Sequence, residues 1–200
     1  MNNAFPYDLV LASASPRRKE LLEQMGFEFK VEVVDADETP DGQLAVEQLP
    51  AWLAKKKAGL IPFIAENTLV IAADTLVILD NRILGKPGNP REAEEMLKSL
   101  SGTSHQVITG VCLRRPHGQT VFSETTYVHF SEITEDEIIH YIQHFKPFDK
   151  AGGYGIQEWI GLRFVNKIVG SYTNVVGLPT ERLYAELKKM ANHPQISGKG

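Results

Sequence analysis

Residues 11–22 read LASASPRRKELL, and they take the chain from a strand directly into a helix. The preceding apolar run, residues 8–12, predicts a short strand. Ser15 is a favourable N-cap and Pro16 suits the first helical position, so a helix is expected over residues 16–25. The turn between them therefore brings a helix N-terminus to the end of a strand.

The start of this helix carries groups that bind anions. Free N–H groups at a helix N-terminus and its partial positive charge favour a negative ligand. Arg17 and Arg18 add fork-shaped donors that match a phosphate group, and the turn from Ser13 to Ser15 would add backbone N–H donors. We predict a phosphate site here. The alternative is an ordinary capped helix whose basic side chains are solvated.

The composition is that of a globular protein without a strong charge bias. The chain has 200 residues, of which 42% are hydrophobic, and a formal net charge of −4. This length allows one large domain or two lobes that share a cleft, and we expect a single domain over residues 1–192 and a disordered polar tail over residues 193–200. A nucleic-acid coat protein usually carries a basic excess, so no stable nucleic-acid partner is expected.

Cysteine usage and hydropathy favour a cytoplasmic protein with no membrane segment. Cys112 is the only cysteine, so no internal disulfide can form, and its strand-like surroundings predict a buried thiol. The sequence has no apolar stretch of about 18 residues and no signal-peptide pattern at its start.

Asp74 interrupts the most apolar segment of the chain, residues 67–79. An aspartate inside a buried strand costs free energy unless it is paired or binds a metal. Asp74 is therefore the strongest single functional candidate, and a strand-end aspartate that caps a turn is the alternative.

A second group of carboxylates lies in residues 35–40, which read DADETP and include Glu38. They follow an alternating apolar and polar run that predicts a strand over residues 27–34. Clustered carboxylates repel each other unless a cation or a basic partner lies among them. The alternative is a solvated acidic loop.

Periodicity and turn residues place the remaining elements. Helices are expected at residues 51–60, 91–100, 135–145 and 180–190. Strands are expected at residues 69–73, 82–84, 105–115, 120–130 and 163–169, and a glycine-bounded loop at residues 170–179. His105 is expected to be structural, because no second histidine lies nearby at the spacing of metal ligands.

Two loops carry further candidate site residues. The loop of residues 85–90 is stiffened by two prolines and holds Lys86, a candidate phosphate lysine, although the Walker spacing is absent from the chain. Residues 149–157 read DKAGGYGIQ, and the three glycines around a tyrosine imply close backbone approach. Gln157 offers an amide that donates and accepts at once, which suits a base edge.

Taken together, these segments resemble the Maf family of nucleoside triphosphate pyrophosphatases over nearly the whole chain, from about Leu9 to Leu187. Seven motifs in the family's order carry the resemblance. They are SASPRR (residues 13–18), LA with KA (53–54, 57–58), ADT (73–75), GKP (85–87), SG with His105 and Val107 (101–107), DKAGGYGIQ (149–157), and GSY through GLP (170–179).

The resemblance implies an α/β fold of the inosine-triphosphatase-like type, with a long twisted mixed sheet and two lobes around a central cleft. It also implies hydrolysis of a nucleoside triphosphate to the monophosphate and pyrophosphate, by metal-assisted attack of water on the α-phosphorus. The motifs look like those of the dTTP/UTP pyrophosphatase branch, for which modified pyrimidine nucleotides are further candidate substrates. A homodimer is often found in the family.

The resemblance also assigns roles by position. Asp74 matches the expected general base, and Asp74 with Glu38 would hold Mg²⁺ or Mn²⁺. Glu38, Lys57 and Lys86 match residues that line the phosphate end of the site, and the specificity positions of the dTTP/UTP branch fall on Arg18, Thr75 and Gln157.

Two alternatives remain open at this point. One is the family branch that prefers 7-methyl-GTP, which has a different segment at residues 151–157. The other is a nucleotide-sensing regulator of septum formation and cell division with little turnover. An aspartate in an apolar strand favours an enzyme, because a sensor needs no group that positions water.

Overall fold

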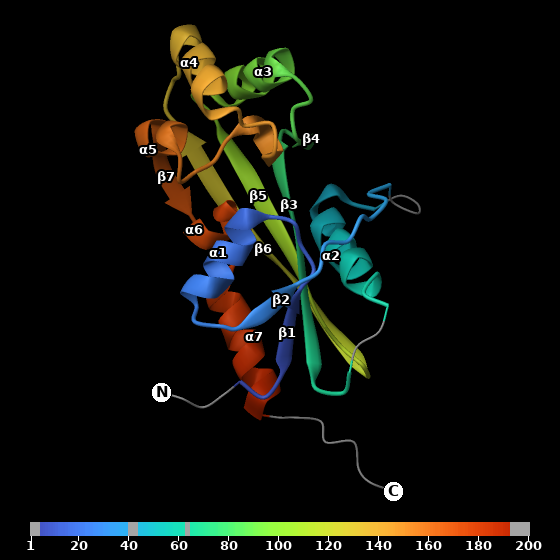
Figure 1. Ribbon diagram of the computed structural model, residues 1–200. Coiled ribbons are helices and arrows are strands. Elements are labelled where there is room, and N and C mark those ends of the chain that lie inside the picture. Colours follow the sequence, from blue (N-terminus) through green and yellow to red (C-terminus); the bar gives the residue numbers. More distant parts are fainter. Residues whose placement is uncertain (1–4, 40–43, 63–64, 193–200) are drawn as a thin grey trace, which may run out of the picture.

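The fold is built on one mixed β-sheet that runs through the whole molecule (Figure 1). The computed structural model describes residues 5–39, 44–62 and 65–192, so the tail expected at residues 193–200 lies outside the described part. The strands are β1 (Asp8–Leu11), β2 (Phe29–Val31), β3 (Thr68–Leu79), β4 (Arg82–Leu84), β5 (Ser104–Arg115), β6 (Gly118–Phe130) and β7 (Val165–Val169). The expected α/β fold with a long mixed sheet is confirmed.

The strand order is β2-β1-β3-β5-β6-β7, and β4 pairs with the far end of β3. β1 is parallel to both β2 and β3, as its helical crossover connections require. From β3 onward each neighbouring pair is antiparallel, and β3 pairs with β5 from Val70–Arg114 to Ile78–Gln106. The three long strands β3, β5 and β6 therefore form a continuous antiparallel centre.

Helices cover the two faces of this sheet at one end. They are α1 (Pro16–Gln24) and α7 (Thr180–Asn192) on one face and α2 (Leu49–Gly59) on the other (Figure 1). The alternation of β3 explains the two layers: Leu69, Ile71 and Ala73 pack with α1 and α7, whereas Val70 and Ala72 pack with α2. We call this end, with its two apolar clusters, the first lobe.

The other end of the long strands carries α3 (Pro90–Leu100), α4 (Glu135–Phe145) and α5 (Trp159–Phe164), which share a separate apolar cluster. We call this end the second lobe. Short turns η1 (Val46–Gln48) and η2 (Ala151–Gly153) and the helix α6 (Tyr172–Val176) complete the described elements. Because both lobes share β3, β5 and β6, the space between them lies over the middle of these strands.

Residues that favour helix starts and tight turns lie at the ends of several elements. The Ser15 side chain accepts from the Arg18 backbone N–H at the start of α1, and Pro50 lies at the start of α2. Thr134 and Glu137 form the capping box of α4. The β3–β4 hairpin turns at Asp80 and Asn81, both with positive φ, as expected of a tight two-residue turn.

Three expectations were wrong. The strand expected at residues 27–34 is limited to β2, because only residues 29–31 pair with β1. The strand expected at residues 163–169 begins at Val165, since the preceding residues form α5, with Ile160 and Phe164 buried one turn apart. The loop expected at residues 170–179 contains α6, which starts at a Ser171 cap that the sequence analysis did not use.

None of the helices in the described ranges is both long and apolar enough to span a membrane. Cys112 is buried on β5, as expected, and burial raises its pKa to about 11.

His105 is a structural residue of the second lobe, as the sequence analysis predicts. It is 2% exposed, its Nε2 lies 2.7 Å from the hydroxyl oxygen of Tyr154, and its ring packs edge-on against Phe130. Burial, with a smaller contribution from His129, lowers the pKa of His105 to about 4. The imidazole is therefore neutral in the folded protein at neutral pH.

This burial predicts a loss of stability in mild acid. Between pH 6.5 and about 4 the unfolded chain binds a proton at His105 that the folded chain does not, so the free energy of unfolding must fall as the pH falls. The full contribution is up to about 3 kcal/mol. Urea titrations give the free energy of unfolding at pH 7 and pH 4.5. Its decrease between these pH values should be smaller for His105→Gln than for the exposed control His117→Gln. Equal losses in the two variants would contradict the prediction.

Candidate functional site

The site begins with the alternation of side chains on β3. Asp74 follows Ala72 on the face that carries α2, whereas Thr75 follows Ala73 on the face that carries α1. Two adjacent residues thus reach two different helices: Asp74 meets Lys57 of α2, and Thr75 meets Arg18 of α1.

Asp74, Lys57 and Glu38 form an ion-pair cluster. The Nζ atom of Lys57 lies 2.6 Å from Oδ1 of Asp74 and 3.0 Å from Oε1 of Glu38. The side chains of Asp74 and Lys57 are only 12% and 16% exposed, whereas that of Glu38 is 60% exposed. The lysine therefore supplies the positive partner that an aspartate in an apolar strand requires.

The same cluster is the place predicted for a metal ion. Within the described ranges no group of three or more His, Cys, Asp or Glu side chains is suited to a metal. Mg²⁺, however, is commonly held by one or two carboxylates together with substrate phosphates. Asp74 and Glu38 converge on one cation, the Lys57 ammonium, so these two carboxylates would also suit a divalent ion held together with substrate phosphates.

Arg18 is bonded mainly to the protein itself. Its guanidinium donates to the carbonyl oxygens of Ala73 (2.7 Å) and Gly177 (2.9 Å), to Oγ1 of Thr75 (3.0 Å) and to Oγ of Ser13 (3.3 Å). Burial lowers its pKa, and the charge of Asp74 acts in the opposite direction. Four of the five N–H donors of Arg18 are thus used to join α1, β3 and the end of α6.

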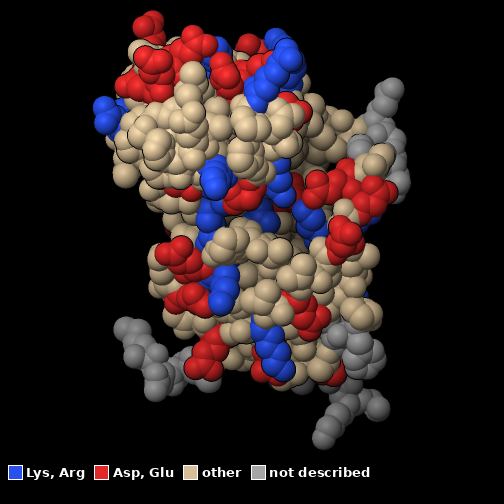
Figure 2. Space-filling view, turned by 45° about the horizontal axis from the view of Figure 1, so that its top comes forward, with Lys and Arg blue, Asp and Glu red and all other residues tan. Residues whose placement is uncertain are grey.

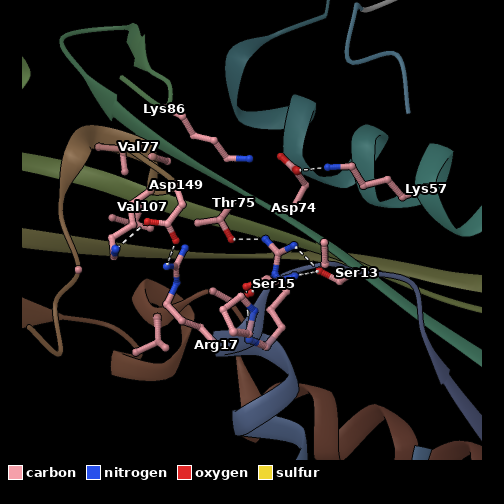
Figure 3. Close-up of a pocket in the computed structure, with 18 of the residues that line it drawn as sticks. Ser13, Ser15, Arg17, Lys57, Asp74, Thr75, Val77, Lys86, Val107 and Asp149 are labelled. Atoms are coloured by element: carbon pink, nitrogen blue, oxygen red, sulfur yellow. Dashed lines mark hydrogen bonds and ion pairs between the residues drawn. The ribbon is translucent and has the colours of Figure 1, made fainter. Parts of the chain in front are cut away.

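Arg17 points across the site toward the second lobe. Its Nη1 lies 2.7 Å from Oδ2 of Asp149, and Oδ1 of the same carboxylate accepts from Lys150 at 2.7 Å (Figure 3). Burial raises the pKa of Asp149, but the donors Lys150 and Arg17 outweigh burial and leave this pKa below its ordinary value. Lys150 is 8% exposed and also pairs with Glu158 at 3.1 Å.

These groups surround a cavity of about 430 Å³ between the two lobes. All ten site residues predicted from the sequence line it: Ser13, Ser15, Arg17, Arg18, Glu38, Lys57, Asp74, Thr75, Lys86 and Gln157. Figure 2 shows this face hollowed, with Lys and Arg side chains gathered at the hollow. The volume falls within the range of small-ligand sites.

Asp149 and Lys150 also line the cavity, although the sequence analysis did not include them among the site residues. The signal that could have found them is the opposite-charge pair next to the glycines of residues 149–157. The structure confirms close backbone approach there, because an added Cβ on Gly152 would lie 3.1 Å from the Val77 side chain.

Two valines form an apolar stretch of the cavity wall, and the charged Asp149 lies next to them (Figure 3). Val77 and Val107 lie on the opposite side of the close-up from Lys57 and Asp74 (Figure 3). Gln157 also lines the cavity, and its buried Oε1 has no hydrogen-bond partner among the described residues. An unpaired buried acceptor costs free energy, which suits a ligand that brings a donor.

Comparisons with known proteins agree over nearly the whole chain. The sequence profile described as "Maf-like protein" matches residues 8–190. A Phocaeicola vulgatus protein named dTTP/UTP pyrophosphatase is 48% identical over 192 residues, which are 95% of this chain and 100% of that protein. A Bacteroides fragilis protein of the same name is 48% identical over 186 residues, 92% of this chain and 96% of that protein.

Among solved structures, a HAM1 protein from Coxiella burnetii is similar at 14% identity with a TM-score of 0.47. The superposition covers 94% of this chain and 100% of that one.

Proposed function

Because this chain belongs to the Maf family, we propose that it is a nucleoside triphosphate pyrophosphatase that hydrolyses dTTP and UTP to the monophosphate and pyrophosphate. The observation that carries the proposal is the buried Asp74 carboxylate, held by Lys57 at 2.6 Å within a cavity lined by further cations. Such a site supplies both a proton acceptor and charge to neutralise a triphosphate.

We assign to Asp74 the orientation of the attacking water. Lys57 contacts Oδ1 of this carboxylate, so Oδ2 is the atom that we assign to the water. A carboxylate held by one ammonium keeps its direction, which is what in-line attack on phosphorus needs. We assign Asp74 the role of general base, and Lys57 the role of neutralising the phosphates once they enter.

The phosphate groups would lie among Arg17, Lys57 and Lys86, next to the N-terminus of α1. Arg17 is bound to Asp149 by an exposed ion pair, which a phosphate can replace at little cost. We assign the phosphate contact to Arg17, since Arg18 has its donors engaged by the protein.

A divalent cation, Mg²⁺ or Mn²⁺, would be held by Asp74 and Glu38 together with the triphosphate. When bound, it would neutralise charge that develops on the phosphate oxygens. The residues fit this ion because their oxygens already converge on a cation.

The nucleobase would lie against the apolar side chains of Val77 and Val107. The unpaired Oε1 of Gln157 is suited to the N3–H group of uracil or thymine. Cytosine has no hydrogen at N3, so it would leave this acceptor unpaired, and a site built for a donor rejects such a ligand strongly. Thr75 lines the same cavity and helps to define the base position.

The first test is pyrophosphate release from dTTP, UTP, CTP, the purine triphosphates and 7-methyl-GTP, each with Mg²⁺, Mn²⁺ or EDTA. We expect release from dTTP and UTP above the others, and its loss in EDTA. Preference for 7-methyl-GTP would agree with the proposed reaction but contradict the assignment of the nucleobase site. Tight nucleotide binding without release would favour the regulator of septum formation.

We further propose that the protein acts in the cytoplasm, as a homodimer and without a nucleic-acid partner, as its resemblance and composition predict. Sedimentation of the purified protein with and without nucleotide tests the dimer.

A further inference from the structure

Thr109 lies directly behind Thr75 and is fully buried. It is the residue of β5 that pairs with Thr75 of β3, and their hydroxyl oxygens are 2.9 Å apart. A hydroxyl in an apolar sheet needs a hydrogen-bond partner, and here the partner is a residue that lines the cavity. The position of Thr109 therefore bears on what Thr75 offers to a ligand.

The direction of each hydrogen bond in this group follows from counting protons. Oγ1 of Thr109 lies 3.0 Å from the carbonyl oxygen of Asn174, and only the hydroxyl can supply the proton between them. Thr109 has no second proton, so Thr75 must donate to Thr109 across their 2.9 Å contact. Thr75 in turn accepts from Nη2 of Arg18 at 3.0 Å.

The count leaves Thr75 with one free lone pair and no free proton. A hydroxyl has one donor and two acceptor positions, and two of these three are used inside the protein. Any ligand group that reaches Oγ1 of Thr75 must therefore be a hydrogen-bond donor.

The carbonyl of Asn174 that starts this chain of bonds is firmly held. Asn174 is 0% exposed, and its Nδ2 donates to the carbonyl oxygen of Val107 (3.0 Å) and to Oγ1 of Thr126 (2.9 Å). Its own carbonyl oxygen also accepts from the backbone N–H of Gly177 (3.1 Å). The acceptor for Thr109 thus cannot turn away without breaking several buried bonds.

We propose that Thr109 is a positioning residue that keeps the Thr75 hydroxyl turned away from the cavity, so that the site selects a pyrimidine with an N3–H donor. The inference rests on the proposed function, since it concerns how that site reads the base. Uracil and thymine carry one proton on N3, which Oε1 of Gln157 and the free lone pair of Thr75 would share in a three-centre hydrogen bond, whereas N3 of cytosine is an acceptor and would face both.

Without the Thr109 hydroxyl, the Thr75 proton loses its acceptor and the hydroxyl can rotate. It can then donate to an acceptor in the cavity, including N3 of cytosine. Removal of a group that does not touch the ligand should therefore change base preference rather than only lower activity.

The test compares kcat/KM for UTP and CTP in the wild type, Thr109→Val and Thr109→Ser, with a thermal melt of each protein. Valine keeps the shape without the hydroxyl, and serine keeps the hydroxyl. We expect the UTP/CTP ratio to fall about tenfold in Thr109→Val, and to return close to the wild-type ratio in Thr109→Ser. Thr103→Val is the control, because its hydroxyl bonds to the Leu100 carbonyl, away from the cavity.

The outcomes separate the inference from the proposed function. Wild-type protein that does not prefer UTP to CTP would overturn the proposed function, and this inference with it, before any variant is examined. A normal wild-type ratio that is unchanged in Thr109→Val, with both kcat/KM values lowered equally, would leave Thr109 a purely structural residue and overturn the inference alone. If Thr109→Val does not fold, Thr109→Ala replaces it, with the same outcomes.

Discussion

Asp74→Asn should lower kcat for dTTP about 10³-fold while the protein stays folded. Asparagine keeps the size of the side chain and its place on β3, but it cannot take a proton from water and carries no charge to hold Lys57. Lys57 retains its contact with Glu38 at 3.0 Å, so the lysine is not left without a partner. Stopped pyrophosphate assays give the rate, and circular dichroism with a thermal melt checks the fold.

Asp80→Asn is the matched control. Asp80 lies in the exposed turn between β3 and β4 with a φ of 48°, a conformation that asparagine adopts readily. Its kcat should equal that of the wild type. A folded Asp74→Asn protein with turnover within about tenfold of the wild type would remove Asp74 from the role of general base.

Gly110→Ala should destabilise the protein by about 3 kcal/mol or more. Gly110 pairs with Asp74 across β3 and β5, and α2 crosses the sheet directly over it. A Cβ atom at this position would lie 2.2 Å from the backbone nitrogen of Ala51 and 2.2 Å from the carbonyl carbon of Pro50. The start of α2 would have to move, and Lys57 would move with it.

The measurement is urea unfolding, followed by kcat/KM for dTTP at a temperature at which the variant is folded. Gly59→Ala is the control on the same helix, because nothing lies within 4 Å of its added Cβ and alanine favours a helix. It should be as stable as the wild type or slightly more stable. An unchanged urea midpoint for Gly110→Ala would show that α2 can lift off the sheet freely.

The sequence predicts residues that line the cavity, but not how these residues pair with one another. Asp74 stands out because an aspartate in an apolar strand needs a positive partner, and Lys57, which also pairs with Glu38, supplies one. The sequence does not reveal that Lys57 contacts Asp74 before any phosphate is present. That contact depends on α2 packing against the face of β3 on which Asp74 lies.

The two adjacent arginines show the same limit. Arg17 and Arg18 are equivalent in composition and in their place at a helix start. One turns to Asp149 and the other to the carbonyl oxygens of Ala73 and Gly177, which lie far away in the sequence. Only the assembled fold decides which guanidinium is engaged and which can meet a ligand.

The sequence analysis did not predict helix α5, and this helix also depends on tertiary packing. An added Cβ on Gly161 would lie 2.0 Å from the carbonyl oxygen of Ile156, so this helix exists because a glycine allows it to pack against the preceding loop. Six residues are too few for periodicity to separate a helix from a strand.

The sharing of β3, β5 and β6 between the two lobes limits how the cavity can open. In many two-lobed proteins the lobes are joined by flexible segments that act as a hinge. Here the β3–β5 ladder is paired without a break from Val70–Arg114 to Ile78–Gln106, and Asp74 and Thr75 lie within it. A hinge between the lobes would bend β3, the strand that carries Asp74, the proposed general base. Substrate should therefore enter by rearrangement of side chains such as Arg17 and Lys57, while the floor of the cavity stays rigid.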